Sequence, residues 1–445
     1  MTFDTTLAWR QRLGGSNLPF VDSRIYTDPK IFDEELAKIW RRSWLLVAHE
    51  SELADVLDFR TTSVAGEPLI LVRGDDGKVR AFLNVCPHRG ALLIREPSGN
   101  LKTENPSGAP KRITCMFHAW QFDARGRCLS IPRRNAGYQD RLRCGDVTLH
   151  EVHCEVGFGG FVWVHLEPDA PQLGEQLSPA FAALLPHLEA EPLEVFHHHK
   201  AIVRTNYKLW HDTNSEFYHD YMHHFNRVTS MQQPGYYDRR YEAFPGAHVS
   251  VSSMAVKYDA YEHADVALAA SRDLSFPLLE RNGWKLLDLF PGITINLRGS
   301  ALRVDTATPI AADRVLIEFR GIGLKNDTAE EREQRVKDHN TIWGPFGRNL
   351  PEDLLGVTNQ GLGMRRGAEG LHVLHGRYEE STIHDETGLR HYYTEWSRRL
   401  GRHANAPYDR YEAESSPLEP IERGASGAHH VTSNSAASGA GVHSA

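Results

Sequence analysis

The spacing of hydrophobic residues changes along the chain. Between residues 28 and 44, apolar side chains recur every three or four positions, which predicts one amphipathic helix. From about residue 44 to 165, short apolar runs alternate with turns, of which Asp76-Gly77 is a clear hairpin signal. The chain is therefore expected to begin with a helical segment and to continue as a small all-β domain of hairpins.

Beyond residue 171 the pattern is mixed. We expect the first helix of this region to have Ser178 as its N-cap and Pro179 in its first turn. Helices and strands without a regular β-α-β order predict an α+β domain. Segments with helical spacing cover residues 178–188, 206–226, 330–340 and 392–402, and segments with alternating apolar residues cover 286–298 and 301–317.

These patterns divide the chain into four parts. We expect an N-terminal helical segment (residues 1–43) that packs on the α+β domain, an all-β domain (44–170), the α+β domain itself (171–414), and a tail (415–445). The tail is rich in Gly, Ala and Ser, which predicts disorder. Within the β domain, residues 95–111 are rich in Pro, Gly, Ser and Asn and predict a surface loop.

Composition narrows the class of protein. Of 445 residues, 40% are hydrophobic and 24% are charged, as in an ordinary globular protein. The net charge of -8 and the lack of a long basic run argue against a nucleic-acid partner. No apolar run reaches the ~18 residues of a membrane span, and the N-terminus lacks an apolar signal core, so we expect a cytoplasmic protein with no membrane partner. Five cysteines in so long a chain argue against a disulfide framework.

The β domain contains a pair of metal-ligand spacings. Cys86-Pro87-His88 is followed by Cys115-Met116-Phe117-His118, which places two thiolates and two imidazoles on two hairpin tips. Two thiolates with two neutral imidazoles suit a two-iron cluster in which histidine replaces cysteine on one iron. Zinc, which also accepts two sulfur and two nitrogen ligands, is the alternative metal.

The α+β domain contains a second candidate metal site. Glu216 and His219 are followed by His223 and His224, and an acidic pair, Glu352-Asp353, lies far downstream. Two histidines and one carboxylate leave coordination positions open on Fe(II), which suits oxygen chemistry. In a straight helix His219 shares a face with His223 rather than with His224, and spacing alone leaves both histidines and both acidic residues as candidates.

The residue pattern resembles a known family. Cys-Pro-His-Arg-Gly at residues 86–90 and Cys-Met-Phe-His-Ala-Trp at residues 115–120 are similar to the ligand signature of Rieske [2Fe-2S] domains. They look most like the large (α) subunits of Rieske non-haem iron aromatic-ring-hydroxylating oxygenases, over roughly residues 30–410. The resemblance implies that Cys86, His88, Cys115 and His118 hold a [2Fe-2S] cluster, and that an all-β Rieske domain is joined to a helix-grip (START-like) α+β catalytic domain with an antiparallel sheet.

The same resemblance implies ligands for a mononuclear Fe(II). Residues 206–224 are similar to the segment of the family that supplies two histidines, which selects His219 and His224 and leaves His223 as the alternative. Alignment on Gly344-Pro345 selects Asp353 as the carboxylate ligand, with Glu352 as the alternative.

The resemblance further implies an assembly of subunits. Glu216 stands where the family usually has aspartate, and it would link His219 to His118 of an adjacent subunit, so that electrons pass between subunits. A homotrimer, or an α3β3 assembly with a small β subunit, would provide that contact. The implied electron donor is an NAD(P)H-dependent reductase, either direct or through a ferredoxin.

The implied reaction uses O2 to hydroxylate an aromatic ring. The overall sequence looks most similar to family members that act on aromatic carboxylates such as anthranilate, salicylate or terephthalate. We expect cis-dihydroxylation; monooxygenation or O-demethylation of another aromatic is the alternative, and a non-catalytic Rieske electron-transfer protein is the rival class. Arg390 is a candidate to bind the substrate carboxylate bidentately, with an ordinary ion pair as its other reading. Trp210 and Phe217 are candidates to line the pocket, with packing in the core as their other reading.

Overall fold

The computed structural model describes residues 20–102, 111–228, 230–232, 234–255, 274–280, 283–366, 372–374 and 386–410. The tail that is expected to be disordered, residues 415–445, lies outside these ranges, as do residues 103–110 of the predicted surface loop. No helix within these ranges combines the length and the apolar character needed to cross a bilayer.

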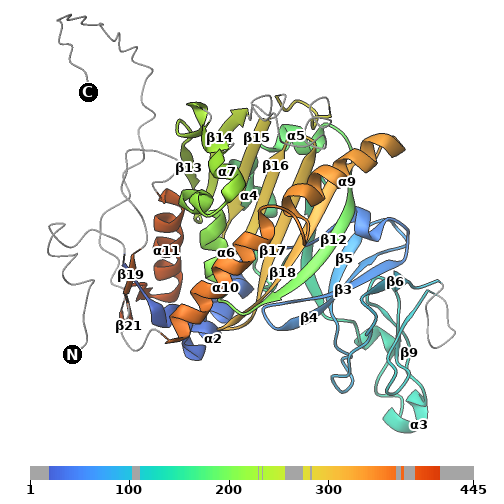
Figure 1. The fold of residues 1–445 in the computed structure, drawn as a ribbon. Helices are drawn as coiled ribbons and strands as arrows, with labels where there is room; N and C mark the ends of the chain where they lie inside the picture. Colours follow the sequence, from blue (N-terminus) through green and yellow to red (C-terminus); the bar gives the residue numbers. More distant parts are fainter. Residues whose placement is uncertain are drawn as a thin grey trace, which may run out of the picture. The chain divides into compact units, whose positions relative to one another are not determined.

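A seven-stranded antiparallel sheet forms most of the first domain (Figure 1), as the all-β prediction requires. The predicted surface loop at residues 95–111 is partly wrong, because its residues 98–100 pair with the neighbouring strand. The strand order is β2 (Leu45–His49), β11 (Phe161–His165), β10 (Glu151–Gly157), β5 (Val79–Leu83), β4 (Glu67–Arg73), β3 (Asp58–Val64), β6 (Ser98–Asn100). A smaller sheet contains β7 (Ile113–Thr114), β8 (Gln121–Phe122) and β9 (Cys128–Ser130), and the helix α3 (Arg134–Tyr138) follows it.

A second seven-stranded antiparallel sheet forms the α+β domain, as predicted. Each of the two alternating segments contains a turn, at Pro291-Gly292 and at Ala312-Asp313, and therefore forms two strands. The strand order is β12 (Leu193–Val203), β18 (Arg314–Leu324), β17 (Ala301–Ala311), β16 (Ile293–Arg298), β15 (Gly283–Leu289), β14 (His248–Ala255), β13 (Tyr241–Phe244). Two-stranded sheets pair β1 (Phe20–Asp22) with β19 (His372–Leu374) and β20 (Arg402–His403) with β21 (Ala406–Arg410).

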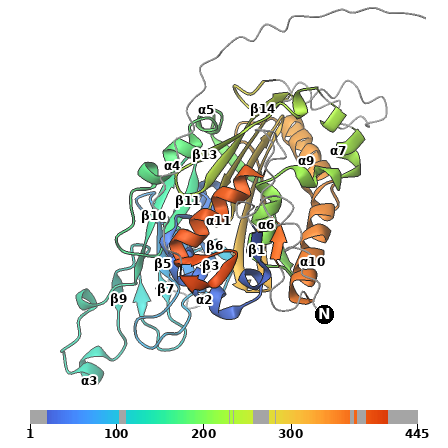
Figure 2. The ribbon, with the colours of Figure 1, turned by 90° about the vertical axis from the view of Figure 1, so that its left-hand side faces the viewer.

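Helices cover the second sheet (Figures 1 and 2). The helices α6 (Tyr207–Asn214) and α9 (Ala329–Trp343) pack on β17, and α10 (Leu350–Arg366) packs on α6. The helix α11 (Thr387–Leu400) packs on β13 and β14 and also contacts α2 (Pro29–Lys38). The first predicted helix is thereby confirmed, although it ends earlier than residue 44.

The predicted helix at residues 178–188 has the wrong bounds. The structure has two helices here, α4 (Leu173–Phe181) and α5 (Leu185–Glu189). The buried apolar face of α4 extends back to Leu173, so the helix begins before the expected N-cap. Pro179 lies inside α4, where it has no N–H to donate, and the helix ends two residues later.

The two sheets share a hydrophobic core. Successive side chains of a strand point to opposite faces, and in β4 both faces are buried. Leu69 and Leu71 belong to the core that also contains Ile317 of β18. Ile70 and Val72 belong to the separate core of the first domain. The first domain is therefore fixed to the second by the packing of its central strands.

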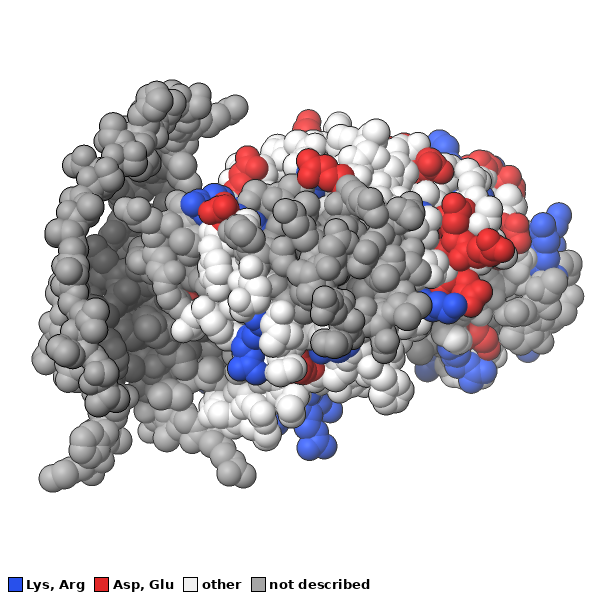
Figure 3. Space-filling view, turned by 45° about the horizontal axis from the view of Figure 1, so that its top comes forward, with Lys and Arg blue, Asp and Glu red and all other residues white. Residues whose placement is uncertain are grey.

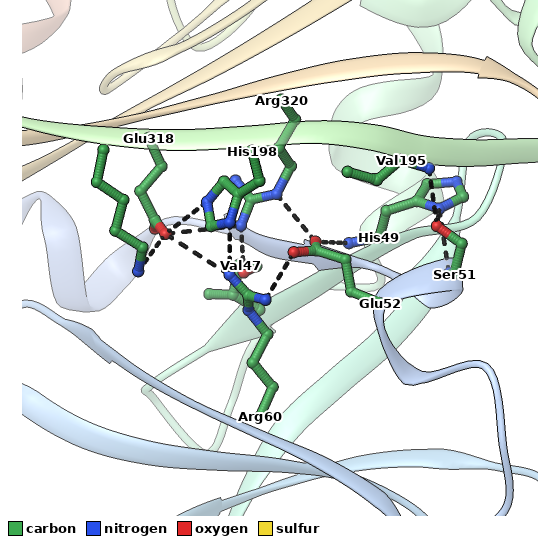
Figure 4. A network of polar contacts seen from close by, with 10 residues as sticks. Val47, His49, Ser51, Glu52, Arg60, Val195, His198, Glu318 and Arg320 are labelled. Atoms are coloured by element: carbon green, nitrogen blue, oxygen red, sulfur yellow. Dashed lines mark hydrogen bonds and ion pairs between the residues drawn. The ribbon is translucent and has the colours of Figure 1, made fainter. Parts of the chain in front are cut away.

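A buried polar network reinforces this junction (Figure 4). Arg320 on β18 donates to Glu52 over 2.9 Å and to the carbonyl of Val47 over 3.1 Å. Arg60 on β3 pairs with the same Glu52 at 2.8 Å and lies 3.9 Å from Glu318. The Arg320 side chain is fully buried, so the loss of its carboxylate partner would leave an unpaired buried charge, which costs several kcal/mol.

Charged side chains of both signs are mixed on the surface. In the described part of the face in Figure 3, acidic and basic side chains lie side by side rather than in one broad field of a single sign. On this face, the described residues therefore do not form one basic patch.

The helix α6 ends at a buried chain of hydrogen bonds. The Ser215 hydroxyl donates to the Asp288 carboxylate on β15, and His211 Nε2 lies 2.9 Å from the same hydroxyl. Burial lowers the pKa of His211 to about 3, so its imidazole is neutral and can donate to Ser215. Thr294 donates to the other oxygen of Asp288 over 2.8 Å. The carboxylate therefore fixes the end of α6 to the sheet.

The predicted helix at residues 206–226 is interrupted at this point. After α6 the chain forms a 3-10 turn, η5 (Tyr218–Tyr221), and then the short helix α7 (His224–Val228). This interruption determines how the side chains of residues 216–224 are presented.

We predict that Asp288 makes the protein less stable as the pH rises from 6 to 8. Burial raises the pKa of Asp288 from its ordinary 3.8 to about 7, so between these values the folded protein holds a proton that the unfolded chain has lost. Raising the pH through 7 therefore reduces the free energy of unfolding, by about 1 kcal/mol for this group. Asp288→Asn cannot ionise, and its stability should fall less over this range.

Unfolding midpoints of the wild type and of Asp288→Asn at pH 6, 7 and 8 test this prediction. Asp305, whose pKa burial also raises to about 7, is present in both proteins, so the difference between their slopes reports Asp288 together with its electrostatic coupling to Asp305. Equal slopes would contradict the assignment.

Candidate functional site

Two loops of the first domain have the same backbone hydrogen bonds. The Cys86 N–H donates to the Ala91 carbonyl, and the Cys86 carbonyl accepts from the Gly90 N–H. Cys115 repeats this pattern with Trp120 and Ala119.

Each loop also turns at the same position. Gly90 has φ +74° and Ala119 has φ +57°, a left-handed conformation that costs a residue with a Cβ free energy. The two sequences therefore fold into equivalent loops that present a cysteine and a histidine each.

The four ligand candidates of the first domain lie together. The Cys86 and Cys115 thiols are buried, and burial raises the pKa of Cys86, with a further increase from its contact with Cys115. The His88 and His118 rings lie 4.6 Å apart between centroids and are partly exposed. The sulfur ligands therefore lie inside the domain and the imidazoles at its surface.

These residues fit a Rieske cluster. The Nδ1 atoms of His88 and His118 are buried and have no hydrogen-bond partner in the described part of the chain. The other side of the His88 ring is fixed, because it stacks on Trp120 at 4.7 Å and its Nε2 lies 3.2 Å from the Tyr138 hydroxyl. Two adjacent thiols and two unpartnered nitrogens match the ligands of a [2Fe-2S] centre with mixed ligation.

A second group of ligands lies in the α+β domain. His219, His223 and Asp353 offer one donor atom each, and these atoms all lie within 4.8 Å of one another. Asp353 Oδ1 is 3.0 Å from His223 Nε2 and 3.7 Å from His219 Nε2. Asp353 comes from the first turn of α10, so residues about 130 positions apart in the sequence form this site.

A carboxylate outside the group holds each imidazole. Glu216 Oε1 lies 2.8 Å from His219 Nδ1, and its other oxygen accepts from the His219 backbone N–H at 3.0 Å. Glu352 Oε2 lies 2.6 Å from His223 Nδ1. Such carboxylates fix the orientation of metal-binding imidazoles and increase their basicity. Glu352, the alternative ligand in the sequence, therefore supports a ligand rather than joining the group.

The electrostatics of the group favour a cation. Burial disfavours a charged imidazole, but the carboxylates of Glu216, Asp353 and Asp220 outweigh it and raise the pKa of His219 to about 10. A site that stabilises positive charge on an imidazole also stabilises a metal cation. The two nitrogens and one carboxylate match the 2-His-1-carboxylate set of non-haem iron.

Of the two alternatives for the second imidazole, the structure brings His223 and not His224 into the ligand group. The His224 side chain is exposed and lies outside the ligand group, whereas His223 is buried. The chain passes from the 3-10 turn η5 to the helix α7 between Tyr221 and His224. At the end of this turn, the Met222 N–H donates to the His219 carbonyl. His219 and His223 therefore share one face, with their ring centroids 5.4 Å apart.

The ligand group opens into a cavity of about 70 Å³. Of the three substrate residues predicted from the sequence, Phe217 lines it, whereas Arg390 and Trp210 are not among its described lining residues. Arg390 donates to Thr387 over 3.0 Å on α11. Trp210 is buried in the main core, because α6 turns it toward the sheet. Within the ranges that it describes, the structure therefore does not bring these two residues into the cavity.

Sequence reasoning missed Arg239, which lines the cavity together with Trp284 and Asn296. Its neighbours in the sequence include the aromatic residues Tyr236, Tyr237 and Tyr241, which is a weak signal, because burial of an arginine among aromatic rings is a property of the tertiary structure. Arg298 and Arg303 also line the cavity.

The chain matches two family models. The Rieske [2Fe-2S] domain matches residues 43–152, and the ring hydroxylating alpha subunit (catalytic domain) matches residues 190–402. These matches contain the two ligand groups described above. In this family the first domain carries a [2Fe-2S] cluster and the second a mononuclear iron.

Full-length relatives agree with the family models. The chain is 56% identical to the methanesulfonate monooxygenase hydroxylase subunit alpha of Methylosulfonomonas methylovora, over 88% of this chain and 94% of that protein. It is 38% identical to the 2-aminobenzenesulfonate 2,3-dioxygenase subunit alpha of an Alcaligenes species, over 87% of this chain and 95% of that protein.

A solved structure supports the fold alone. Naphthalene 1,2-dioxygenase from a Rhodococcus species superimposes with a TM-score of 0.72 at 18% identity, over 86% of this chain and 94% of that one. The chain therefore belongs to the Rieske non-haem iron oxygenases, as an α subunit that joins a Rieske domain to an iron-binding catalytic domain.

Proposed function

We propose that this protein is a terminal oxygenase that uses O2 and electrons from a partner reductase to hydroxylate an organic sulfonate. The observation that carries the proposal is the 56% identity, over nearly the whole length, to a protein named for methanesulfonate. A second relative, at 38% identity, is named for an aromatic sulfonate. A sulfonate therefore replaces the aromatic carboxylate expected from the sequence as the first candidate substrate.

The cavity supports a small anionic substrate. Arg239, Arg298 and Arg303 line it, and Arg239 offers buried donors that have no acceptor among the described residues, so an anion can bind at that end. Its volume of about 70 Å³ compares with the roughly 10–15 Å³ that one buried water needs by the same measure. This space matches a ligand of a few heavy atoms, so we favour a short alkanesulfonate over an arenesulfonate.

The proposed ligands form two sites, one for a [2Fe-2S] cluster and one for a mononuclear iron. When bound, the cluster supplies single electrons and the mononuclear iron activates O2 beside the substrate. We propose that Cys86, His88, Cys115 and His118 hold the cluster and that His219, His223 and Asp353 hold the iron. Glu216 and Glu352 would keep the two imidazoles in place, and the buried surroundings exclude water.

We further propose that chains assemble so that the Rieske tip of one lies against the catalytic domain of the next. Met116 and Phe117, beside His118, are 68% and 57% exposed. On the catalytic side, Tyr221 is 48% exposed and Phe346 is fully exposed. Large exposed apolar side chains gathered at both sites favour an interface. A ring of three such contacts, with or without a small β subunit, accounts for both surfaces.

Within this assembly, Glu216 is placed to connect the two sites. It already binds His219 and is only partly buried, so an outer imidazole can reach its carboxylate. We propose that His118 of the partner subunit is that imidazole. The extra methylene of glutamate, compared with the aspartate usual in the family, lengthens the link without removing either acceptor oxygen.

We predict that His223→Ala removes the mononuclear iron and abolishes turnover, whereas His224→Ala retains both. His223 is buried beside Asp353, and His224 is exposed. Iron content per chain and product formation measure the effect, and the visible spectrum of the Rieske cluster controls for folding. Loss of iron in His224→Ala with retention in His223→Ala would restore the original choice of ligand.

We predict different defects for Glu216→Gln and Glu352→Gln, although each removes one charge beside one imidazole. Glu352→Gln should weaken iron binding by about 10- to 100-fold and leave electron transfer intact in protein reloaded with iron. Glu216→Gln should in addition leave the Rieske cluster reduced when substrate and O2 are added. Single-turnover spectroscopy separates the two, and equal rates of cluster reoxidation would contradict the bridging role.

We predict that O2 uptake by the iron-loaded oxygenase with a reductase increases with methanesulfonate more than with acetate, benzoate or anthranilate. Product analysis for formaldehyde and sulfite would show monooxygenation at the carbon beside sulfur. A diol formed from 2-aminobenzenesulfonate would instead indicate an aromatic sulfonate. Turnover of aromatic carboxylates alone would reject the sulfonate and restore the original expectation.

A further inference from the structure

Arg239 is a charged residue of the catalytic domain that is buried among aromatic rings. It lies just before β13, and only 1% of its surface is exposed. Its guanidinium carbon lies 4.3 Å from the ring centroid of Trp284, 4.4 Å from that of Tyr236 and 5.1 Å from that of Phe217. Three aromatic rings therefore hold the guanidinium by cation–π contact and keep water away from it.

The hydrogen-bond donors of Arg239 are largely unused. Its Nε donates to the Tyr236 carbonyl over 3.1 Å. Its Nη1 and Nη2 are buried and have no acceptor among the residues that the structure describes. A guanidinium has five N–H donors, and leaving buried donors unpaired costs free energy.

Other buried arginines of the domain are different. Arg320 donates to Glu52 over 2.9 Å, and Arg335 donates to Asp327 over 2.9 Å. Each holds a carboxylate of the protein, as a structural arginine must when it is buried. The nearby Asp220 does not fill this role for Arg239: its oxygens accept from Asn226 and Tyr236, and neither Nη1 nor Nη2 of Arg239 donates to it.

Arg239 lies in the same cavity as the proposed iron ligands. The cavity is lined by Arg239, His219, His223 and Asp353. Phe217 connects the two ends, because its ring lies 6.2 Å from the His219 ring and beneath the Arg239 guanidinium. A ligand held by Arg239 is therefore close to the metal site.

A third donor faces the same cavity. Asn296 on β16 lines it, and the Asn296 Oδ1 accepts from Trp284 Nε1 over 2.7 Å. This bond leaves the NH2 group of Asn296 without a partner within the described ranges. Because Arg239 lies over the Trp284 ring, Trp284 positions both donor groups. Two guanidinium nitrogens and one amide nitrogen match a ligand with three oxygen atoms.

We propose that Arg239 is the anion anchor of the substrate pocket, that its Nη1 and Nη2 bind two oxygens of a sulfonate, and that Asn296 binds the third. This inference rests on the proposed function and assigns its specificity to particular residues. Arginine suits the task because its planar fork binds paired oxygens bidentately. A carboxylate has only two oxygens and would leave Asn296 unpaired, so the site should prefer a sulfonate.

Binding of methanesulfonate to the iron-loaded protein with its cluster oxidised tests the anchor. Titration calorimetry gives the dissociation constant, and initial rates give KM and kcat separately. For Arg239→Gln we expect roughly 100-fold weaker binding, since two charge-assisted hydrogen bonds are lost. Arg239→Lys keeps the charge but loses the fork, and we expect about 10-fold weaker binding.

Arg240→Gln is the matched control. Arg240 is the next residue, is exposed, and donates to backbone carbonyls at the surface, so this change removes the same charge without touching the cavity. Its binding constant should equal that of the wild type. Asn296→Asp, which replaces a donor with a repelling carboxylate, should weaken sulfonate binding as well.

The outcomes separate the anchor from the proposed function. Unchanged sulfonate binding in Arg239→Gln would overturn the anchor, even if the wild type oxidises sulfonates. If the wild type binds benzoate and no sulfonate, the proposed substrate is wrong, and the anchor then stands only if Arg239→Gln weakens benzoate binding. If Arg239→Gln does not fold, as shown by its thermal transition and Rieske spectrum, Arg239→Lys decides, and wild-type affinity in that variant would reject the anchor.

Discussion

The catalytic domain depends on the buried hydrogen bonds that end the helix α6. Asp288 holds the Ser215 hydroxyl, and the neutral imidazole of His211 completes the chain. The start of α11 packs so closely on Ser215 that a side chain at Gly388 would meet the Ser215 backbone. The helix must therefore stop at one defined residue. Because both imidazole ligands proposed for the mononuclear iron, His219 and His223, follow within the next eight residues, this stop sets their positions.

The sequence predicts the two metal groups to different degrees for a physical reason. Each half of the Rieske group is a single short loop, and the positive φ of Gly90 and of Ala119 is a local property of that loop. Ligand identity follows from local sequence there. In the catalytic domain the choice between His223 and His224 depends on where α6 stops, and that is set by Asp288, more than 60 residues downstream. Spacing in the sequence contains no such information.

The fold, too, was predicted correctly where local sequence decides it and wrongly where tertiary contacts do. Alternating segments predicted the second sheet, and the apolar runs predicted the first, because both patterns report which face of a strand is buried. The helix bounds at residues 178–188 and 206–226 were wrong where tertiary contacts overrode local signals. The arginines show the limit of sequence reasoning most clearly. Arg390 stood beside aromatic residues as Arg239 does, but only tertiary structure shows which of them is buried in the cavity.

The two ends of the cavity favour ligands of opposite charge. At one end the carboxylates around His219 favour added positive charge. At the other end the Arg239 guanidinium is held away from water, and no carboxylate among the described residues accepts a hydrogen bond from it. Opposite charges that share one cavity attract each other more strongly where the dielectric constant is low than in water. A cation at the first end and an anion at the second therefore stabilise each other as well as the protein, and by linkage each tightens the binding of the other. In our proposal, the hydrogen-bond partners that Arg239 lacks within the described residues are the oxygens of the bound substrate.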